Sequence, residues 1–222
     1  WIYSRVFTES NYASNDPVRV SEQITYANGL QQVIQNQAHL QSQNKVLVSQ
    51  TVQEFSGRPS LNSMAAPVEG KIAFGFEAHY LSSSNGDVYT AADFDENSNY
   101  HSPAAVTGSL SDYYSNANAD NSIPDAEGYP YSRTIYYRDG TNRVKEQGGV
   151  GATHKVGTIH SIKTYYGSVS DQELIRIFGD EAPIDSSVYK IVNVDANQVA
   201  TVSYISKEGQ VIATCLAVGA DI

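Results

Sequence analysis

The stretch IYYRDGTNRVKEQ, which runs from Ile135 to Gln147, has the pattern of one β-hairpin. Two tyrosines precede Asp139 and Gly140, and the chain returns through Arg143, Val144 and Lys145. Aromatic and β-branched residues favour a pleated strand, whereas Asp and Gly favour a tight turn. The stretch therefore predicts two antiparallel strands that are joined at Asp139 and Gly140.

Three more phrases of the chain share this pattern: ITYANGLQQVIQ from Ile24, VQEFSGRPSLN from Val52 and VSYISKEGQVIA from Val202. Each phrase places an aromatic residue before turn residues that include Gly, and a polar-apolar strand returns after the turn. The four aromatic-glycine pairs are Tyr26 with Gly29, Phe55 with Gly57, Tyr137 with Gly140, and Tyr204 with Gly209. A single hairpin buries too little surface to be stable, so we expect each aromatic side chain to cover a neighbouring hairpin.

Two details of the first two hairpins can be predicted. Asn28 and Gly29 tolerate positive φ, so they are expected to form the first turn, with a return strand from Leu30 to Leu40. The second phrase contains Pro59, which cannot donate to a strand ladder, and its continuation as a central strand is therefore unexpected.

The middle of the chain has a different composition. There is no Lys or Arg from Ile72 to Ser132, while nine Asp and Glu residues occur from Glu77 to Glu127. The segment is also rich in Asn, Ser, Gly and Pro, which favour turns over regular pairing. We expect a solvated, acidic set of long loops with a short helical turn near Leu110 to Asn116.

One helix is predicted in SDQELIRIFGD, near residues 171–178. Ser170 is placed to cap its first turn, and Glu173 three residues later completes a capping box. Gly179 is placed to end the helix. The apolar stripe of this helix would consist of Leu174, Ile177 and Phe178.

The fold class that follows is all-β, with successive antiparallel hairpins, long loops and one short helix. We expect a first hairpin region at 1–71, an acidic loop-rich insertion at 72–132 and a second hairpin region at 133–222. With 222 residues and 41% hydrophobic content, these regions could form one continuous unit. We also expect that unit to be part of a larger protein.

The phrases resemble degenerate YD repeats of RHS proteins, in which a Tyr-Asp pair is followed by Gly-Arg and a short apolar strand. Gly57 and Arg58 keep the Gly-Arg pair. More specific blocks are similar to the domain that opens the RHS region in Gram-negative bacteria with type IX secretion. These blocks are WIYSR at 1–5, ITYANGLQQ at 24–32, VQEFSGRPS at 52–60, PDAEGYPYSRTIYYRDGTNRVKEQGGVGATHKVG at 124–157, and HSIKTYYG at 160–167.

The resemblance implies a β-hairpin strip or shell that scaffolds or encloses a C-terminal effector in a secreted or cell-surface protein. Its implied partners are the downstream repeats of the same polypeptide and the type IX secretion machinery. The alternative is a surface adhesin or glycan-binding β module that uses the Tyr-rich and Asn-rich loops. The 16 tyrosines of the chain suit either function, because a Tyr ring packs on apolar surface while its hydroxyl binds polar groups.

Charge and motif content exclude several other classes. A net charge of −10 disfavours nucleic acid as a partner. The sequence has no apolar run of about 18 residues, so it predicts no membrane insertion. Cys215 lies in an apolar strand pattern and is expected to be a small buried hydrophobe. His154 and His160 match no zinc spacing, so we assign them structural hydrogen bonds. Because no nucleophile or acid-base motif occurs, we expect a non-catalytic protein without a cofactor.

Calcium is the one metal for which the sequence offers candidate ligands. In DFDENSN, oxygen-bearing side chains alternate, as they do in a calcium loop. The sixth position is Ser98 rather than Gly, and the twelfth is Ala104 rather than Glu, so the match is incomplete. We predict no metal centre, and the candidate ligands are Asp93, Asp95, Asn97 and Asn99.

Overall fold

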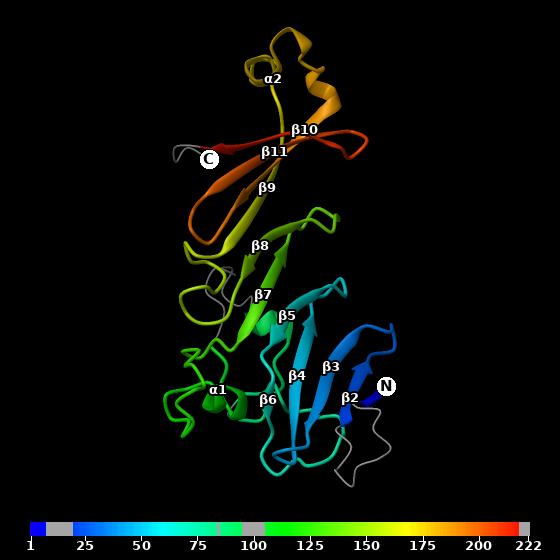
Figure 1. Ribbon diagram of the computed structural model, residues 1–222, viewed down its shortest axis with the longest axis vertical. Coiled ribbons are helices and arrows are strands. Elements are labelled where there is room, and N and C mark those ends of the chain that lie inside the picture. The colour runs from blue at the N-terminus through cyan, green and yellow to red at the C-terminus, as the bar shows by residue number, and fades with distance from the viewer. Residues whose placement is uncertain (8–19, 84, 95–104, 218–222) are drawn as a thin grey trace, which may run out of the picture. The chain divides into compact units, whose positions relative to one another are not determined.

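The computed structural model describes residues 1–7, 20–83, 85–94 and 105–217 of the chain (Figure 1). These residues form an all-β fold of antiparallel strands with short helices, which confirms the predicted class. The chain divides into two compact units. Unit 1 comprises Trp1–Arg133 and Gly149–Gly157, and unit 2 comprises Thr134–Gly148 and Thr158–Ile222. The division differs from the three regions expected from composition, because residues 72–132 belong to the same unit as residues 1–71.

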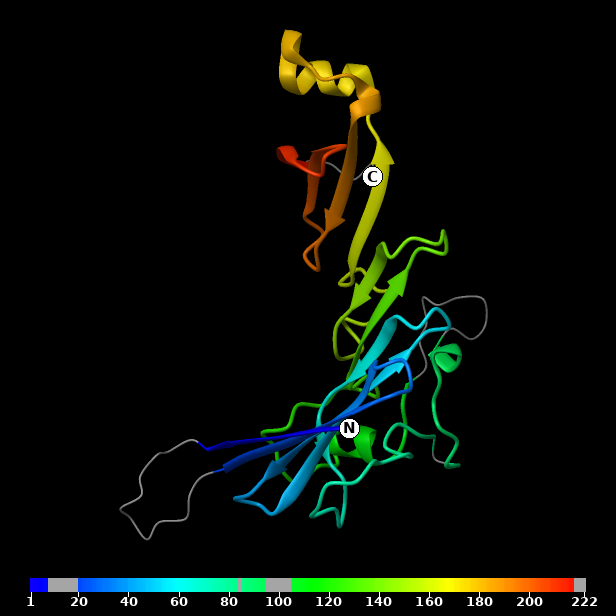
Figure 2. The same cartoon turned by 90° about the vertical axis from the view of Figure 1, so that its right-hand side faces the viewer.

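Unit 1 is built on an antiparallel sheet with the strand order β1-β2-β3-β4-β5-β7. Figures 1 and 2 show β2, β3 and β4 side by side. The strands are β1 (Ile2–Phe7), β2 (Val20–Ala27), β3 (Val33–Leu40), β4 (Lys45–Gln53), β5 (Pro59–Ser63) and β7 (Tyr131–Tyr136), with the short β6 (Ala66–Pro67) paired to β4. The first three residues of β7 belong to this unit.

One face of this sheet is covered by the acidic segment, contrary to the prediction of a solvated insertion. The segment contains the 3-10 helix η1 (Ala91–Phe94), the helix α1 (Ser109–Tyr113) and long loops. Among its described carboxylates, Asp93 lies in η1 and Asp112 in α1, and the others lie outside helices as expected. Its apolar side chains pack onto the sheet. The core consists of Val46, Val48, Leu61 and Ala66 from β4 to β6, Tyr131 from β7, and Tyr80, Leu81, Phe94, Val106, Leu110, Tyr114 and Ala126 from the segment.

Two buried glutamines of β3 hold the start of this cover. Gln35 donates to the carbonyl of Glu77 (2.8 Å) and accepts from its N–H (2.9 Å). Gln37 makes the same pair of bonds with Gly75, at 2.6 and 3.2 Å. The two side-chain amides thus replace a neighbouring strand, and they satisfy backbone groups that would otherwise be buried without partners.

Unit 2 contains the rest of β7, β8 (Val144–Gly148) and an antiparallel sheet that extends from β9 to β12. The other strands are β9 (Ile162–Ser168), β10 (Val188–Val194), β11 (Ala200–Ser206) and β12 (Val211–Ala217). Between β9 and β10 lie α2 (Asp171–Phe178) and the 3-10 helices η2 (Gly179–Glu181) and η3 (Asp185–Ser187), as Figure 2 shows. Neither α1 nor α2 has the length and apolarity to cross a bilayer.

The predicted helix is confirmed at α2. The side chain of Ser170 accepts from the N–H of Glu173 (3.3 Å), and Gly179 ends the helix with φ 62°. Leu174 is fully buried and Phe178 packs beside it, over Val169, which follows β9, and over Val188 and Tyr204 of the sheet. The predicted stripe was wrong at Ile177, which is 40% exposed, because the two-turn helix turns this position away from the sheet.

All four phrases fold into hairpins: β2-β3, β4-β5, β7-β8 and β11-β12. The first return strand begins at Val33 rather than Leu30, since Asn28 Oδ1 accepts from the N–H groups of Leu30 and Gln32 and thereby holds a longer turn. Pro59 is the first residue of β5. The later residues of β5 pair with both β4 and β7, so β5 is a central strand, contrary to the prediction. At the first position of a strand a proline removes no inner ladder bond.

Candidate functional site

The turn glycines of the four phrases do not all have the same backbone conformation. Gly57, Gly140 and Gly209 have φ of 77°, 74° and 84°, a region that side chains other than Gly rarely enter. Gly29 does not, which corrects the prediction for the first turn. There the positive φ (62°) lies at Gln31, because the bonds to Asn28 close the loop two residues later.

Three of the four aromatic residues pack against other parts of the chain, but among their described ring contacts only that of Tyr137 is made to another paired strand, as predicted. Tyr26 packs edge-on against Phe76 at a centroid distance of 5.5 Å. Tyr137 packs edge-on against Tyr166 at 5.7 Å, and its hydroxyl donates to a β9 carbonyl at 2.9 Å. Tyr204 is buried in the core of unit 2.

Phe55 is the exception among the four. It is 89% exposed and therefore covers no neighbouring hairpin within the described structure. It lies at the second position of a tight turn, between β4 and β5, from which its side chain points to solvent rather than onto the sheet. The prediction for this residue was wrong.

Arg58 organises the second turn. Its Nε donates to Glu54 Oε1 at 2.9 Å, and that oxygen also accepts from the backbone N–H of Ser56. Burial alone would raise the pKa of Glu54, but the bonds and charge of Arg58 outweigh it and lower the pKa. Gln32 of the first turn donates to the carbonyl of Gly57 at 2.5 Å, so the tips of two successive hairpins are joined.

The third turn carries a comparable charged pair. Asp139 accepts from the N–H of Thr141 (3.0 Å) and from the guanidinium of Arg143. The hydroxyl of Thr141, followed by Arg143, lowers the pKa of Asp139 well below its usual range. Arg143 also lies 4.8 Å from the centroid of Tyr166. These contacts fix the hairpin tip and point to a structural role for the phrase.

A polar cluster joins α2 to the sheet of unit 2. Lys190 Nζ donates to both carboxylate oxygens of Glu173 at 2.9 Å, and the hydroxyl of Tyr204 donates to the same carboxylate at 2.7 Å. Burial would raise the pKa of Glu173, but these two partners lower it. Burial, followed by the bond to Glu173, raises the pKa of Tyr204. The cluster attaches the helix to β10 and β11.

Cys215 is exposed, which corrects its expected burial. It lies on β12, which is bonded to β11 alone among the described strands of unit 2. His160 has the expected structural bond, with its Nδ1 2.8 Å from the carbonyl oxygen of Ala196. The backbone carbonyl of His154 accepts from the N–H of Gly149 at 2.7 Å.

Of the candidate calcium ligands, the structure describes Asp93 only, because Asp95, Asn97 and Asn99 lie outside the described residues. Asp93 Oδ2 accepts from the N–H (2.6 Å) and the hydroxyl (2.8 Å) of Thr90, and these bonds lower its pKa. The carboxylate thus caps η1. Within residues 1–7, 20–83, 85–94 and 105–217, no group of three or more His, Cys, Asp or Glu side chains is arranged to hold a metal ion.

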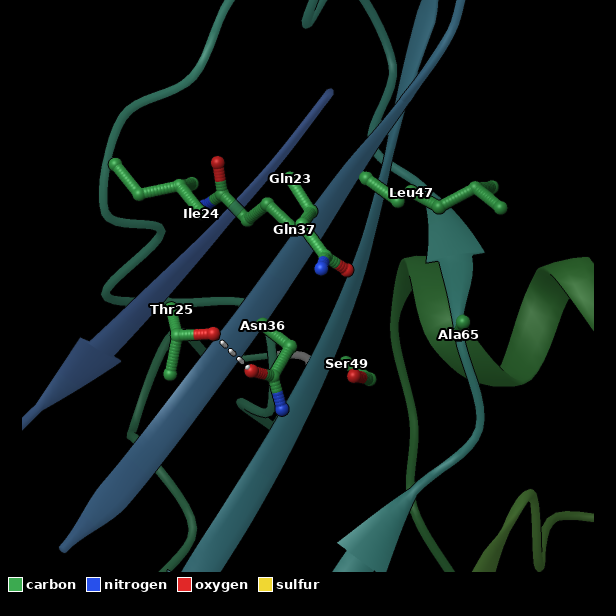
Figure 3. A pocket seen from close by; sticks show the side chains of 9 residues that line it. Gln23, Ile24, Thr25, Asn36, Gln37, Leu47, Ser49 and Ala65 are labelled. Atoms are coloured by element: carbon green, nitrogen blue, oxygen red, sulfur yellow. Dashed lines mark hydrogen bonds between the residues drawn. The ribbon is translucent and has the colours of Figure 1, made fainter. Parts of the chain in front are cut away.

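The sheet of unit 1 also has a hollow that the sequence did not predict. It lies on the face opposite the acidic segment and has a volume of about 140 Å³ (Figure 3). The hydroxyl of Thr25 donates to Asn36 Oδ1 at 2.8 Å inside it. The lining residues are Gln23, Ile24, Thr25, Asn36, Gln37, Ala38, Leu47, Ser49 and Ala65. Strand alternation places Gln23, Thr25, Asn36, Ala38, Leu47 and Ser49 on this face, and only the strand register brings them together. Ile24 and Gln37 have their side chains on the opposite face.

No protein-family model matches the chain, and no curated protein matches it either.

Proposed function

We propose that this chain is a non-catalytic structural segment of a large secreted or cell-surface RHS-repeat protein. In this proposal its hairpins form part of a strip or shell that scaffolds or encloses a C-terminal effector. The downstream repeats of the same polypeptide and the type IX secretion machinery are its partners. The folding of all four phrases as hairpins supports the proposal, as does the bond between the first two hairpin tips.

The observation that carries the proposal is the outer edge of β12. This strand has no charged residue and no proline, and it pairs with β11 alone in the described part of unit 2. Val211 and Leu216 are 61% and 65% exposed. Natural sheets protect such apolar edges with charge, proline, bulges or a covering segment, and of these β12 has, within the described residues, only a register shift opposite Tyr204 and Ile205. In the proposal a further strand of the same polypeptide provides that cover.

The test is the association state of the isolated 222-residue chain, measured by size-exclusion chromatography with light scattering. Without a covering strand we expect it to self-associate through β12, and Leu216→Lys should shift it to monomer. Leu30→Lys is the matched control, because Leu30 is 77% exposed but lies in a turn. A monomeric parent chain with slow hydrogen exchange in β12 would contradict the proposal.

Peptide mapping of the native polypeptide is the complementary experiment. Further aromatic-glycine hairpin phrases beyond this chain would support a repeat protein. Their absence would contradict it.

The alternative, a glycan-binding module that uses the Tyr-rich and Asn-rich loops, has less support. Tyr80, Tyr114 and Tyr131 are buried in the core of unit 1 and cannot stack on a sugar. The hydroxyls of Tyr80 and Tyr114 bind the backbone carbonyls of Met64 and Ala65.

A further inference from the structure

One pattern of side chains occurs three times across the two sheets. In each case a Thr hydroxyl donates to the Oδ1 of an Asn on the next strand, at 2.8 or 2.9 Å, and a Ser or Thr lies opposite that Asn on the third strand. The rows are Thr25-Asn36-Ser49 and Thr51-Asn62-Ser132 in unit 1, and Thr164-Asn193-Thr201 in unit 2.

The hydrogen bond in each row orients the amide group. Because the Thr hydroxyl is bonded to the carbonyl oxygen of Asn, the amide nitrogen is left with two N–H donors. No described residue accepts from the amide nitrogens of Asn36, Asn62 or Asn193, and all three side chains are exposed. Each row therefore offers fixed donors beside hydroxyl groups, which both donate and accept.

The sheet face that bears the first two rows, here called the open face, has almost no charge. Among the described strand residues of unit 1, Lys45 is the one charged side chain on it, at the end of β4. Protein surfaces that are designed for solubility carry about 25–35% charged residues. The main residues of the open face are Ser4, Ser21, Gln23, Thr25, Asn36, Ala38, Leu47, Ser49, Thr51, Asn62 and Ser132. A chain with a net charge of −10 thus keeps one polar face almost free of charge.

The first row lies in the hollow. Asn36 and Ser49 provide polar groups, while Ala38, Leu47 and Ala65 provide apolar surface (Figure 3). The volume of about 140 Å³ is similar to that of a cavity of about 150 Å³ that holds one six-membered ring. The hollow therefore suits a ring that has both C–H and hydroxyl surface.

We propose that this hollow binds one ring of a neutral saccharide. The amide nitrogen of Asn36 donates to a sugar hydroxyl, the Ser49 hydroxyl exchanges a further hydrogen bond, and Ala38 contacts the C–H surface. Charged glycans bind less well, because none of the residues that line the hollow is a cation that could repay the desolvation of their anionic groups. No aromatic ring lines the hollow, so stacking contributes nothing and the expected Kd is weak, about 1 mM. The inference does not depend on the function proposed above.

The test is NMR chemical-shift perturbation of the whole chain by cellotetraose, maltotetraose and chitotetraose, with tetragalacturonate as the charged counterpart. At about 10 mM, at least one neutral oligosaccharide should give saturable shifts at residues around Asn36, and tetragalacturonate should not. Asn36→Asp removes the donors and adds a charge, so the affinity should fall about tenfold or more.

Asn62→Asp is the matched control, because it makes the same change in an equivalent row outside the hollow. It should leave the affinity within about twofold. Ala38→Leu fills the hollow without adding charge and should also abolish the shifts, which keeps the test decisive if Asn36→Asp fails to fold. The proposal is overturned if no neutral oligosaccharide binds, if tetragalacturonate binds equally well, or if Asn62→Asp weakens binding as much as Asn36→Asp.

Discussion

The cores of the two units are built in different ways. In unit 1 a long segment of loops and two short helices covers the sheet, and twelve buried side chains form the core. In unit 2 the cover is the two-turn helix α2, and the core has four buried residues: Val169, Leu174, Val188 and Tyr204. An acidic, loop-rich segment therefore buries more apolar side chains against its sheet than a well-capped helix does, and buried apolar area sets the hydrophobic contribution to stability.

The largest expected difference concerns two leucines that are both fully buried, Leu61 in unit 1 and Leu174 in unit 2. Leu61→Ala should reduce the free energy of unfolding by about 3–5 kcal/mol, since the dense core around it cannot collapse into the cavity. Leu174→Ala should cost about 2–3 kcal/mol, because α2 can shift toward the sheet. Urea denaturation followed by circular dichroism gives both values.

Hydrogen exchange with mass spectrometry assigns each loss to its unit. Leu30→Ala, an exposed turn substitution, should change stability by less than about 0.5 kcal/mol. Equal losses for Leu61→Ala and Leu174→Ala would contradict the comparison of the two cores.

A smaller effect is expected at the glutamine contacts that hold the cover of unit 1. Gln37→Met keeps the side-chain length but leaves the backbone N–H and carbonyl of Gly75 without their partner. The expected loss is about 2–3 kcal/mol, with faster hydrogen exchange at residues 74–77. Gln23→Met, on the opposite face, is the control and should be nearly neutral. Similar losses for both variants would show that the amide contacts do not hold the segment.

The smallest effect concerns the pH dependence of the α2 attachment. Lys190 and Tyr204 lower the folded-state pKa of Glu173 despite its burial. The ionised Glu173 carboxylate therefore contributes to the free energy of unfolding. This contribution is fully present above the unfolded-state pKa of about 4.3 and is lost as the pH falls through the folded-state pKa. Because the carboxylate is 29% exposed, we expect less than about 1 kcal/mol.

Hydrogen exchange of α2 measured from neutral to acidic pH tests this prediction, after correction for the intrinsic exchange rate. Protection should decrease on acidification in the parent chain and should change little in Glu173→Gln. A decrease of equal size in Glu173→Gln would assign the pH dependence to another group.

Much of the local structure could be predicted from short stretches of sequence. The four hairpins and the Ser170-capped helix depend on residues within a few positions of one another, and the structure confirms them. Exposure was less predictable. Phe55 and Cys215 were expected to be covered, but burial depends on which segments pack nearby, and neither has a cover in the described structure.

The candidate saccharide site shows the same limit. Alternation along β2, β3 and β4 places Thr25, Asn36 and Ser49 on some face of a sheet, but pairs of strands could have joined in several registers. The observed registers align the three side chains in one row. A sequence search for hydroxyl and amide residues at alternate strand positions would have suggested the face without locating the hollow.

The sequence by itself thus determined the all-β class, the positions of the four turns and the one well-capped helix. Turn and cap preferences act through local backbone geometry, which requires no distant partner. Only the tertiary structure decided that the acidic segment covers the sheet of unit 1, that β12 presents an apolar edge, and that three Thr-Asn rows form. These features depend on contacts between residues far apart in the chain, and composition alone carries no information about such contacts.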